Sequence, residues 1–149
     1  MSVCFLSLET SKIFNQLILD ELSKQGFDGL SNALIVIFPY IYEYKGITPS
    51  ALASKIGYTR QAMHKNLIKL ETLGYIAFES GANKKEKAVL LEKKGMKLMK
   101  SATAFIDNMQ QELLDLLGEE RLHEFMESQY KIIAHLNNKK SLFSAVLTT

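Results

Sequence analysis

The sequence is poor in several residue types, and each shortage narrows the possibilities. It has no tryptophan, two prolines and one cysteine, Cys4, in 149 residues. One cysteine cannot form an intrachain disulfide, which is typical of proteins in a reducing compartment. The longest apolar segment, residues 33–42, is interrupted by Pro39 and is shorter than the roughly 18 residues of a membrane span. No basic targeting region precedes the first apolar residues. We therefore expect a cytoplasmic protein with no membrane partner.

No pattern of catalytic or metal-binding residues is visible. The three histidines are scattered, and Cys4 has no partner motif. The chain lacks a glycine-rich phosphate loop and a cluster of ligands at metal spacing. Glu119 and Glu120 lie where a helix should begin, so their carboxylates are expected to complement the helix dipole. We therefore expect no enzyme activity, no metal and no cofactor.

Positive charge is concentrated in one part of the chain. The net charge is only +2, but residues 45–95 contain ten lysines or arginines against four acidic residues, so this segment carries +6 and the remainder −4. The total length suits one domain and leaves no spare length for a separate catalytic unit. A local basic surface indicates an anionic partner such as nucleic acid.

The basic segment contains two short helix patterns joined by a glycine. Thr48 is a suitable N-cap and Pro49 a suitable first helical residue, so one helix is expected from there to about residue 56, before Gly57. Thr59 is expected to cap a second helix that ends at Gly74. Three apolar residues share one face of that helix: Met63, Leu67 and Leu70. The pattern predicts a helix-turn-helix.

A second face of this helix carries polar side chains that suit DNA. An α-helix fits the major groove, where arginine can pair with guanine and glutamine with adenine. The helix N-terminus, with its threonine cap, is expected to hold a phosphate. The expected DNA-binding residues of this helix are Thr59, Arg60, Gln61, His64, Lys65 and Lys69. A helical hairpin with a merely solvated polar face is the alternative interpretation.

A β-hairpin is predicted directly after this helix pair. Residues 75–78 and 87–91 have strand character, and the loop between them contains Gly81 and Asn83, which favour turns. Lysines follow at positions 84, 85 and 87. In this position a hairpin is expected to act as a wing, with Lys84, Lys85 and Lys87 contacting phosphates. A solvated loop is the alternative.

The rest of the sequence predicts helices with apolar faces. Helices are expected over residues 7–24, 31–44, 93–117 and up to about 137, with Pro39 kinking or ending the second. The third has a coiled-coil-like row of apolar residues: Met99, Ala102, Ile106, Met109, Leu113 and Leu116. Packing on the chain's own core is one way to cover these faces. A symmetric homodimer is the preferred one, and it predicts an inverted-repeat DNA site with half-sites about 34 Å apart.

Residues from about 46 to 95 resemble the winged helix-turn-helix of the MarR (multiple antibiotic resistance regulator) family of transcription factors. The resemblance rests on SALASKIGYTRQAMHKNLIKLETLGYI and the later VLLEKKG. It implies a mainly α fold with a small β-hairpin, a single domain over 1–149, a winged helix over about 46–95, and dimerisation helices over about 7–24 and 95–137. The family's wing usually carries aspartate and arginine where this chain has Asn83 and Lys85. Lys85 is therefore expected to contact phosphate rather than bases.

The resemblance also implies a function and its regulation. The expected function is that of a dimeric, sequence-specific transcription regulator, a repressor controlled by a small aromatic ligand or by oxidation of a cysteine. Cys4 is the only redox candidate, and the candidate ligand region is Phe38, Tyr40, Tyr42 and Tyr44. Packing is the alternative role for these aromatics. The alternative functions are a winged-helix protein that binds other proteins and an architectural protein that binds DNA without sequence preference.

Overall fold

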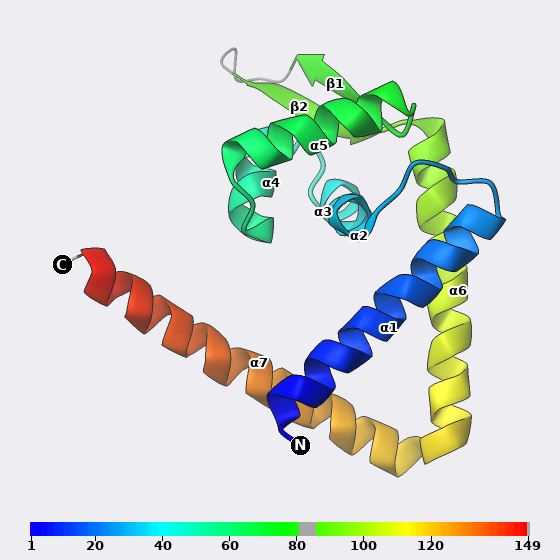
Figure 1. The fold of residues 1–149 in the computed structure, drawn as a ribbon, viewed down its shortest axis with the longest axis vertical. Coiled ribbons are helices and arrows are strands. Elements are labelled where there is room, and N and C mark those ends of the chain that lie inside the picture. Colours follow the sequence, from blue (N-terminus) through cyan, green and yellow to red (C-terminus); the bar gives the residue numbers. More distant parts are fainter. Residues whose placement is uncertain (81–85, 149) are drawn as a thin grey trace. The chain divides into compact units, whose positions relative to one another are not determined.

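The protein is mainly helical, with one small β-hairpin. The computed structural model describes residues 1–80 and 86–148, with side chains up to residue 140. The chain divides into two compact units, Met1–Ile106 and Asp107–Thr149. Figure 1 shows the elements, which are α1 (Val3–Lys24), α2 (Asn32–Ile35), α3 (Ile37–Glu43), α4 (Pro49–Ile56), α5 (Arg60–Thr72), β1 (Ile76–Ser80), β2 (Lys87–Leu91), α6 (Lys93–Leu117) and α7 (Glu119–Thr148). The expected fold class is confirmed.

Helices α4 and α5 form the predicted helix-turn-helix, and both expected threonine caps are present. The Thr48 hydroxyl accepts a hydrogen bond from the Ala51 amide at 3.3 Å, and the Thr59 hydroxyl accepts one from the Ala62 amide at 3.1 Å. These bonds satisfy amide groups that have no partner within the first turn. Gly57 ends α4 with a φ of +87°, a left-handed conformation that other residues rarely adopt. The caps and the glycine together place the start of α5.

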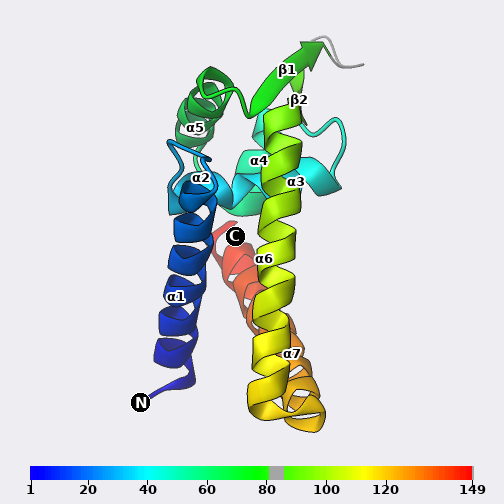
Figure 2. The ribbon, with the colours of Figure 1, turned by 90° about the vertical axis from the view of Figure 1, so that its right-hand side faces the viewer.

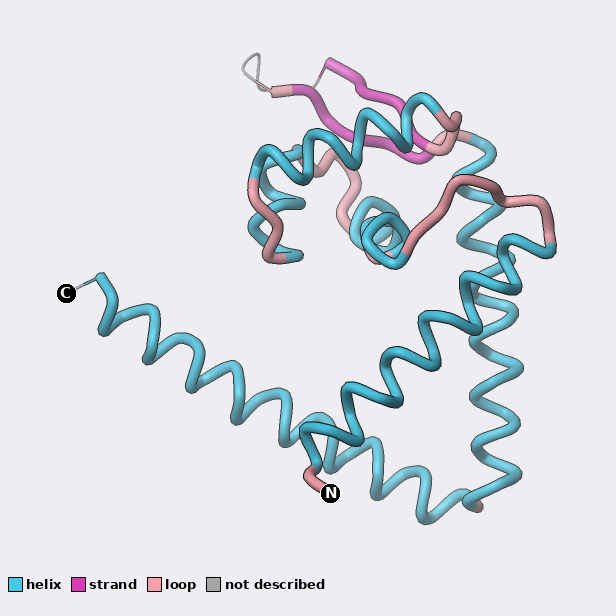
Figure 3. Tube along the Cα trace, viewed as in Figure 1, coloured by secondary structure: helices cyan, strands magenta, loops and turns pink. Residues whose placement is uncertain are grey.

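The predicted hairpin follows α5 immediately (Figure 3). Strands β1 and β2 are antiparallel, with Ile76 opposite Leu91 and Ser80 opposite Lys87. Strand β1 continues to Ser80, two residues beyond the predicted end. The β2 strand is also attached to the chain ahead of α4, because the Val89 amide donates to the Ile47 carbonyl at 2.8 Å. The predictions for Gly81, Asn83, Lys84 and Lys85 lie outside the described residues.

The core of the first unit is built around Tyr75, which is fully buried. Phe38 of α3 meets its ring edge to face, with centroids 5.6 Å apart, and the Tyr75 hydroxyl donates to the Asp28 carbonyl at 2.9 Å. Burial raises the pKa of Tyr75, and the nearby negative charge of Asp28 adds to the effect. The α5 face predicted to be buried is confirmed, since three side chains have no exposed area: Met63, Leu67 and Leu70.

The requirement for glycine at the end of the string VLLEKKG has a steric explanation. A Cβ atom at Gly95 would overlap the backbone carbonyl oxygen of Tyr75 and would approach Leu91 to 3.1 Å. That same carbonyl accepts a hydrogen bond from the Glu92 amide at 2.9 Å. Only a residue without a side chain lets the first turn of α6 lie this close to the start of β1.

The apolar helix expected over residues 31–44 is interrupted at Val36, not at Pro39. Proline cannot donate to the carbonyl four residues earlier and its ring clashes with that carbonyl. For Pro39 the affected residue is Ile35, which is where α2 ends. Pro39 itself lies in the first turn of α3, where no amide donor is needed. The prediction identified the correct residue but placed the break three residues too late.

The long helices extend further than expected at two ends. Helix α1 begins at Val3, because the Ser2 hydroxyl accepts from the Phe5 amide at 3.1 Å and caps the helix there. Helix α6 has the predicted bounds and is followed by Gly118 at a φ of +83°. Helix α7 continues past Asn137 and Asn138 to Thr148, since a mid-helix asparagine costs no more than about 0.7 kcal/mol relative to alanine. Within the described residues, no helix is both long and apolar enough to cross a bilayer.

Candidate nucleic-acid interface

The polar face of α5 is exposed along its length. Burial of Met63, Leu67 and Leu70 turns the remaining faces of the helix outward. Each residue expected to bind DNA from this helix is exposed: Thr59, Arg60, Gln61, His64, Lys65 and Lys69. The structure therefore brings these six residues together on one surface. Their role in binding DNA remains a prediction.

The hairpin lies at the same end of the first unit as α5 (Figure 2), and α5 packs on β1. Lys87, the first residue of β2, is exposed and opposes Ser80 across the hairpin. It is the one wing lysine among the described residues, since Lys84 and Lys85 lie outside them. The hairpin that packs on α5 thus carries an exposed ammonium group, as expected for a wing.

Sequence analysis missed one residue of this surface, Glu86. Its carboxylate accepts a hydrogen bond from the Ser50 amide at 2.9 Å and another from the Ser50 hydroxyl at 2.7 Å. These bonds lower the pKa of Glu86, and the charge of Arg60 lowers it further. No local pattern signals this contact, because the two residues are 36 positions apart.

The aromatic residues of the candidate ligand region are separated by the structure. Phe38 is buried in the core, whereas Tyr40 and Tyr44 stack on each other with centroids 6.4 Å apart. The Lys55 ammonium lies 4.3 Å from the centre of the Tyr44 ring, which is cation–π distance. Tyr42 lines a cleft. The four aromatic side chains therefore have different surroundings.

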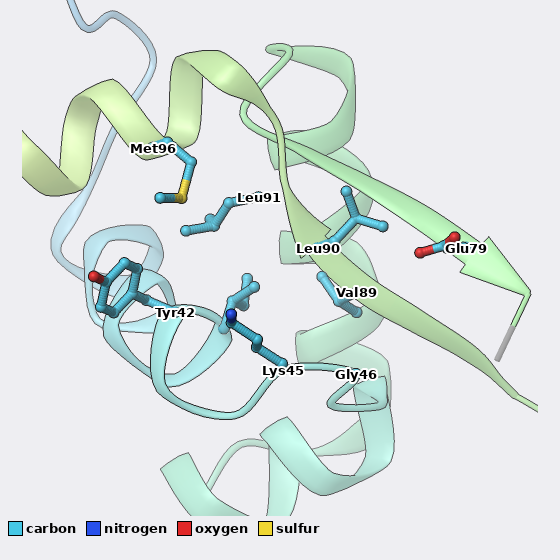
Figure 4. Close-up of a pocket in the computed structure, with 9 residues that line it drawn as sticks. Tyr42, Lys45, Gly46, Glu79, Val89, Leu90, Leu91 and Met96 are labelled. Carbon is cyan, nitrogen blue, oxygen red and sulfur yellow. The ribbon is translucent and has the colours of Figure 1, made fainter. Parts of the chain in front are cut away.

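Tyr42 lines a cleft of about 520 Å³ between α3, β2 and the start of α6 (Figure 4). Most of its wall is aliphatic. The groups that carry a charge or a hydroxyl are Tyr42, Lys45 and Glu79, and the remaining lining residues are Ile41, Gly46, Val89, Leu90, Leu91 and Met96. Such a surface suits a small, largely apolar molecule with a polar end. The sequence pointed to this region through Tyr42 alone.

Other reactive side chains stay apart. Cys4 is exposed in the first turn of α1. His123 pairs with Glu127 at 3.4 Å on the surface of α7. Among residues 1–80 and 86–148 no three histidine, cysteine or acidic side chains gather in a way that holds a metal ion.

Comparison with solved structures places this arrangement among known folds. A complex of the Staphylococcus aureus regulator MepR with DNA matches at a TM-score of 0.75, with 22% identity over 91% of this chain and 98% of that chain. MepR alone, described as a transcription regulator of the multidrug efflux pump MepA, matches at 0.69, with 23% identity over 91% and 99%. MepR bound to ethidium bromide matches at 0.62, with 24% identity over 91% and 97%.

The chain has the fold of MepR, a MarR-family regulator. The likeness covers nearly the whole of both chains, so it includes the flanking helices as well as the winged helix. No family model matches the sequence. No curated protein matches it either. The expected winged-helix fold is thus confirmed by structural similarity, at 22–24% sequence identity.

Proposed function

We propose that this protein is a DNA-binding transcription regulator that acts as a homodimer on an inverted-repeat operator. One observation carries the proposal: a capped helix buries one apolar row and presents Arg60, Gln61, His64 and Lys65 on its free surface, beside a hairpin that carries Lys87. A merely solvated helix has no need of a fastened hairpin next to it. That MepR has been seen bound to DNA adds support.

The residues divide the work according to their chemistry. Arg60 and Gln61 read base edges, since both can form paired hydrogen bonds in the major groove. His64 and Lys65 contact bases or nearby phosphates, while Thr59 and the α5 N-terminus hold a phosphate. Lys69 and the wing lysines Lys84, Lys85 and Lys87 add affinity for the backbone without sequence preference.

A second copy of the chain covers the apolar faces of the long helices. Large apolar side chains with at least half of their area exposed occur in α1 and α7, among them Phe5, Leu8, Ile13, Phe125 and Ile133. Exposed apolar patches of this kind mark interaction surfaces. Two-fold symmetry presents two copies of α5 to successive major grooves, about 34 Å apart. A dimer bound at a promoter then excludes RNA polymerase, so repression is the expected outcome. The expected location of the protein is the cytoplasm.

A small ligand entering the cleft beside Tyr42 regulates binding. The cleft touches β2 of the hairpin and α6, so a ligand that prefers one arrangement of these elements shifts the protein toward it. An aromatic molecule with an anionic end fits the aliphatic wall and the Lys45 ammonium. Titration with such molecules should displace operator DNA in the wild type and not in a Met96→Trp variant, where the cleft is filled. Equal displacement in both would remove the cleft from the mechanism.

Selection of bound fragments from random or genomic DNA tests the main proposal. A shared inverted repeat among the selected fragments is expected. Salt-sensitive binding without a shared sequence would instead show an architectural DNA-binding protein. Absence of binding at low salt would leave only the protein-interaction alternative.

Two variants then separate base reading from charge attraction. Arg60→Ala should reduce the preference for operator over random DNA by about 10-fold or more, because one paired base contact is worth about 1–3 kcal/mol. Lys87→Ala should weaken binding to all sequences alike and reduce the slope of log affinity against log salt by about 0.9 for each of the two contacts that the homodimer loses. Lys12→Ala, which removes the same charge from an exposed position on α1, is the control and should change neither quantity.

A further inference from the structure

Glu86 joins three parts of the proposed DNA-binding surface. It lies immediately before β2, it accepts two hydrogen bonds from Ser50 in the first turn of α4, and it is close enough to Arg60, the first residue of α5, to feel its charge. Helix α4 has no acidic residue of its own in its first turn. The carboxylate from the hairpin therefore supplies the negative charge that a helix N-terminus favours.

This contact belongs to a continuous line of attachment. The Val89 amide donates to the Ile47 carbonyl, and three residues forward from Ile47 and three back from Val89 are Ser50 and Glu86. The two attachments thus follow the same antiparallel register, one through backbone atoms and one through a side chain. Such a sequence of contacts fastens the hairpin to the chain around the start of α4 over several residues.

A carboxylate is an unfavourable group on a surface that approaches phosphates. Its removal alone should strengthen DNA binding by reducing repulsion. A negative charge at this place therefore needs a compensating role, and the two hydrogen bonds to Ser50 are the contacts through which it can act.

We propose that Glu86 is a positioning residue that fastens the hairpin to the N-terminus of α4 and so sets the place of Lys87 relative to Arg60 on the DNA. The inference rests on the proposed DNA-binding function. Glu86 touches no base or phosphate itself and acts through the residues on either side of it. The competing interpretation is that its carboxylate occupies an anion site at the helix N-terminus which a DNA phosphate takes over on binding.

Operator affinity decides between these interpretations, because they predict opposite signs. Glu86→Ala removes both hydrogen bonds and should weaken binding about 10-fold, and Glu86→Gln, which keeps one acceptor, should weaken it about 3-fold. Glu92→Gln is the matched control, since it removes the same charge from an exposed position directly after β2. It should leave binding unchanged or slightly tighter. Tighter binding by Glu86→Gln and Glu86→Ala would overturn the positioning role.

A double-mutant cycle adds a readout that general loss of stability does not move. If Glu86 places Lys87, Lys87→Ala should cost less affinity in the Glu86→Ala background than in the wild type, and the salt slope should fall little further. The Glu92→Gln background should leave the effect of Lys87→Ala at its wild-type size. Additive effects of Glu86→Ala and Lys87→Ala would contradict the proposal.

Hydrogen exchange without DNA tests the contact separately from the function. The Ser50 amide should be protected in the wild type and in Glu92→Gln, and should exchange faster in Glu86→Ala, while amides in the middle of α5 keep their protection. Wild-type DNA binding with no change at Ser50 would overturn this inference and leave the proposed function standing. Absence of wild-type DNA binding would overturn the proposed function itself, whatever Ser50 shows.

Discussion

Two rows of apolar side chains with similar helical spacing differ in burial: one is buried and the other is largely exposed. In α5, Met63, Leu67 and Leu70 have no exposed area. In α7, Phe125 and Ile133 keep 53% of their area exposed, although they continue a row that begins with Leu122, which is buried. The period identifies which face of a helix is apolar. It does not identify what covers that face.

Helix α1 shows the same contrast within one element. Leu22, near its end, is 1% exposed and belongs to the core of the first unit, whereas Leu8 and Ile13 are 65% and 56% exposed. The apolar residues of the winged-helix part are therefore covered within one chain, which we call the covered region, whereas those on the outer parts of the long helices are exposed, which we call the exposed region. The proposed dimer accounts for this difference, and the two regions should respond differently to substitution.

The largest expected effect, on dimer formation and operator affinity, comes from a substitution in the exposed region. Ile133→Glu puts a carboxylate in the middle of the apolar row of α7, and burying an unpaired charge in an interface costs several kcal/mol. We expect the protein to become monomeric and to lose at least about 100-fold in operator affinity, because one half-site then binds alone. Sedimentation equilibrium and DNA titration measure the two quantities.

Asn138→Glu is the matched control for this variant. It introduces the same charge on the same helix, five residues further on and about 140° around it, so it lies on the polar side. It should remain dimeric and bind operator normally. If Ile133→Glu also stays dimeric, the apolar row of α7 is not the interface.

Local signals account for what the sequence predicted well. Thr48 and Thr59 cap helices three residues from the amides they bind, and Gly57 and Gly74 adopt positive φ angles where the helix patterns stop. Each of these features depends on neighbours within a few positions. The helix-turn-helix, the hairpin and the bounds of α6 were therefore predictable.

Features that depend on distant residues were not predictable. Glu86 and Ser50 are 36 positions apart, and the Tyr75 hydroxyl meets the Asp28 carbonyl 47 positions away. The four aromatic residues of the candidate ligand region have different surroundings for a simpler reason. Residues two apart on a helix point in nearly opposite directions, so the ring of Tyr40 finds that of Tyr44 four residues on and not that of Phe38.

An intermediate effect, on the free energy of unfolding, is expected from a substitution at Gly95 in the covered region. Gly95→Ala adds a Cβ that overlaps the Tyr75 carbonyl oxygen, a backbone atom that cannot turn away. Crowding of this kind costs about 1–3 kcal/mol of unfolding free energy. Denaturant unfolding followed by circular dichroism measures it. Gly26→Ala has no neighbouring atom within 4 Å at its Cβ position, so its loss reports only the positive φ angle, which Gly95 does not have. Without crowding, Gly95→Ala should stabilise α6 by up to about 1 kcal/mol, so a gain in stability would mean that the close approach to Tyr75 is unimportant.

The smallest expected effect comes from a substitution that breaks a contact between α6 and the end of α5. The Lys94 ammonium donates to the Leu73 carbonyl at the end of α5, at 2.8 Å, and lies 4.3 Å from the centre of the Tyr75 ring. Lys94→Met keeps most of the aliphatic chain but loses the helix-end hydrogen bond and the cation–π contact, which together are worth about 1 kcal/mol. Lys93→Met, an equal change of charge at the exposed neighbouring position, should have almost no effect. The loss of stability should appear as a lower unfolding midpoint in denaturant. The dimer should be unchanged, because Lys94 lies in the covered region. A change in sedimentation without a change in unfolding would place Lys94 in the other region and would contradict the division drawn between them.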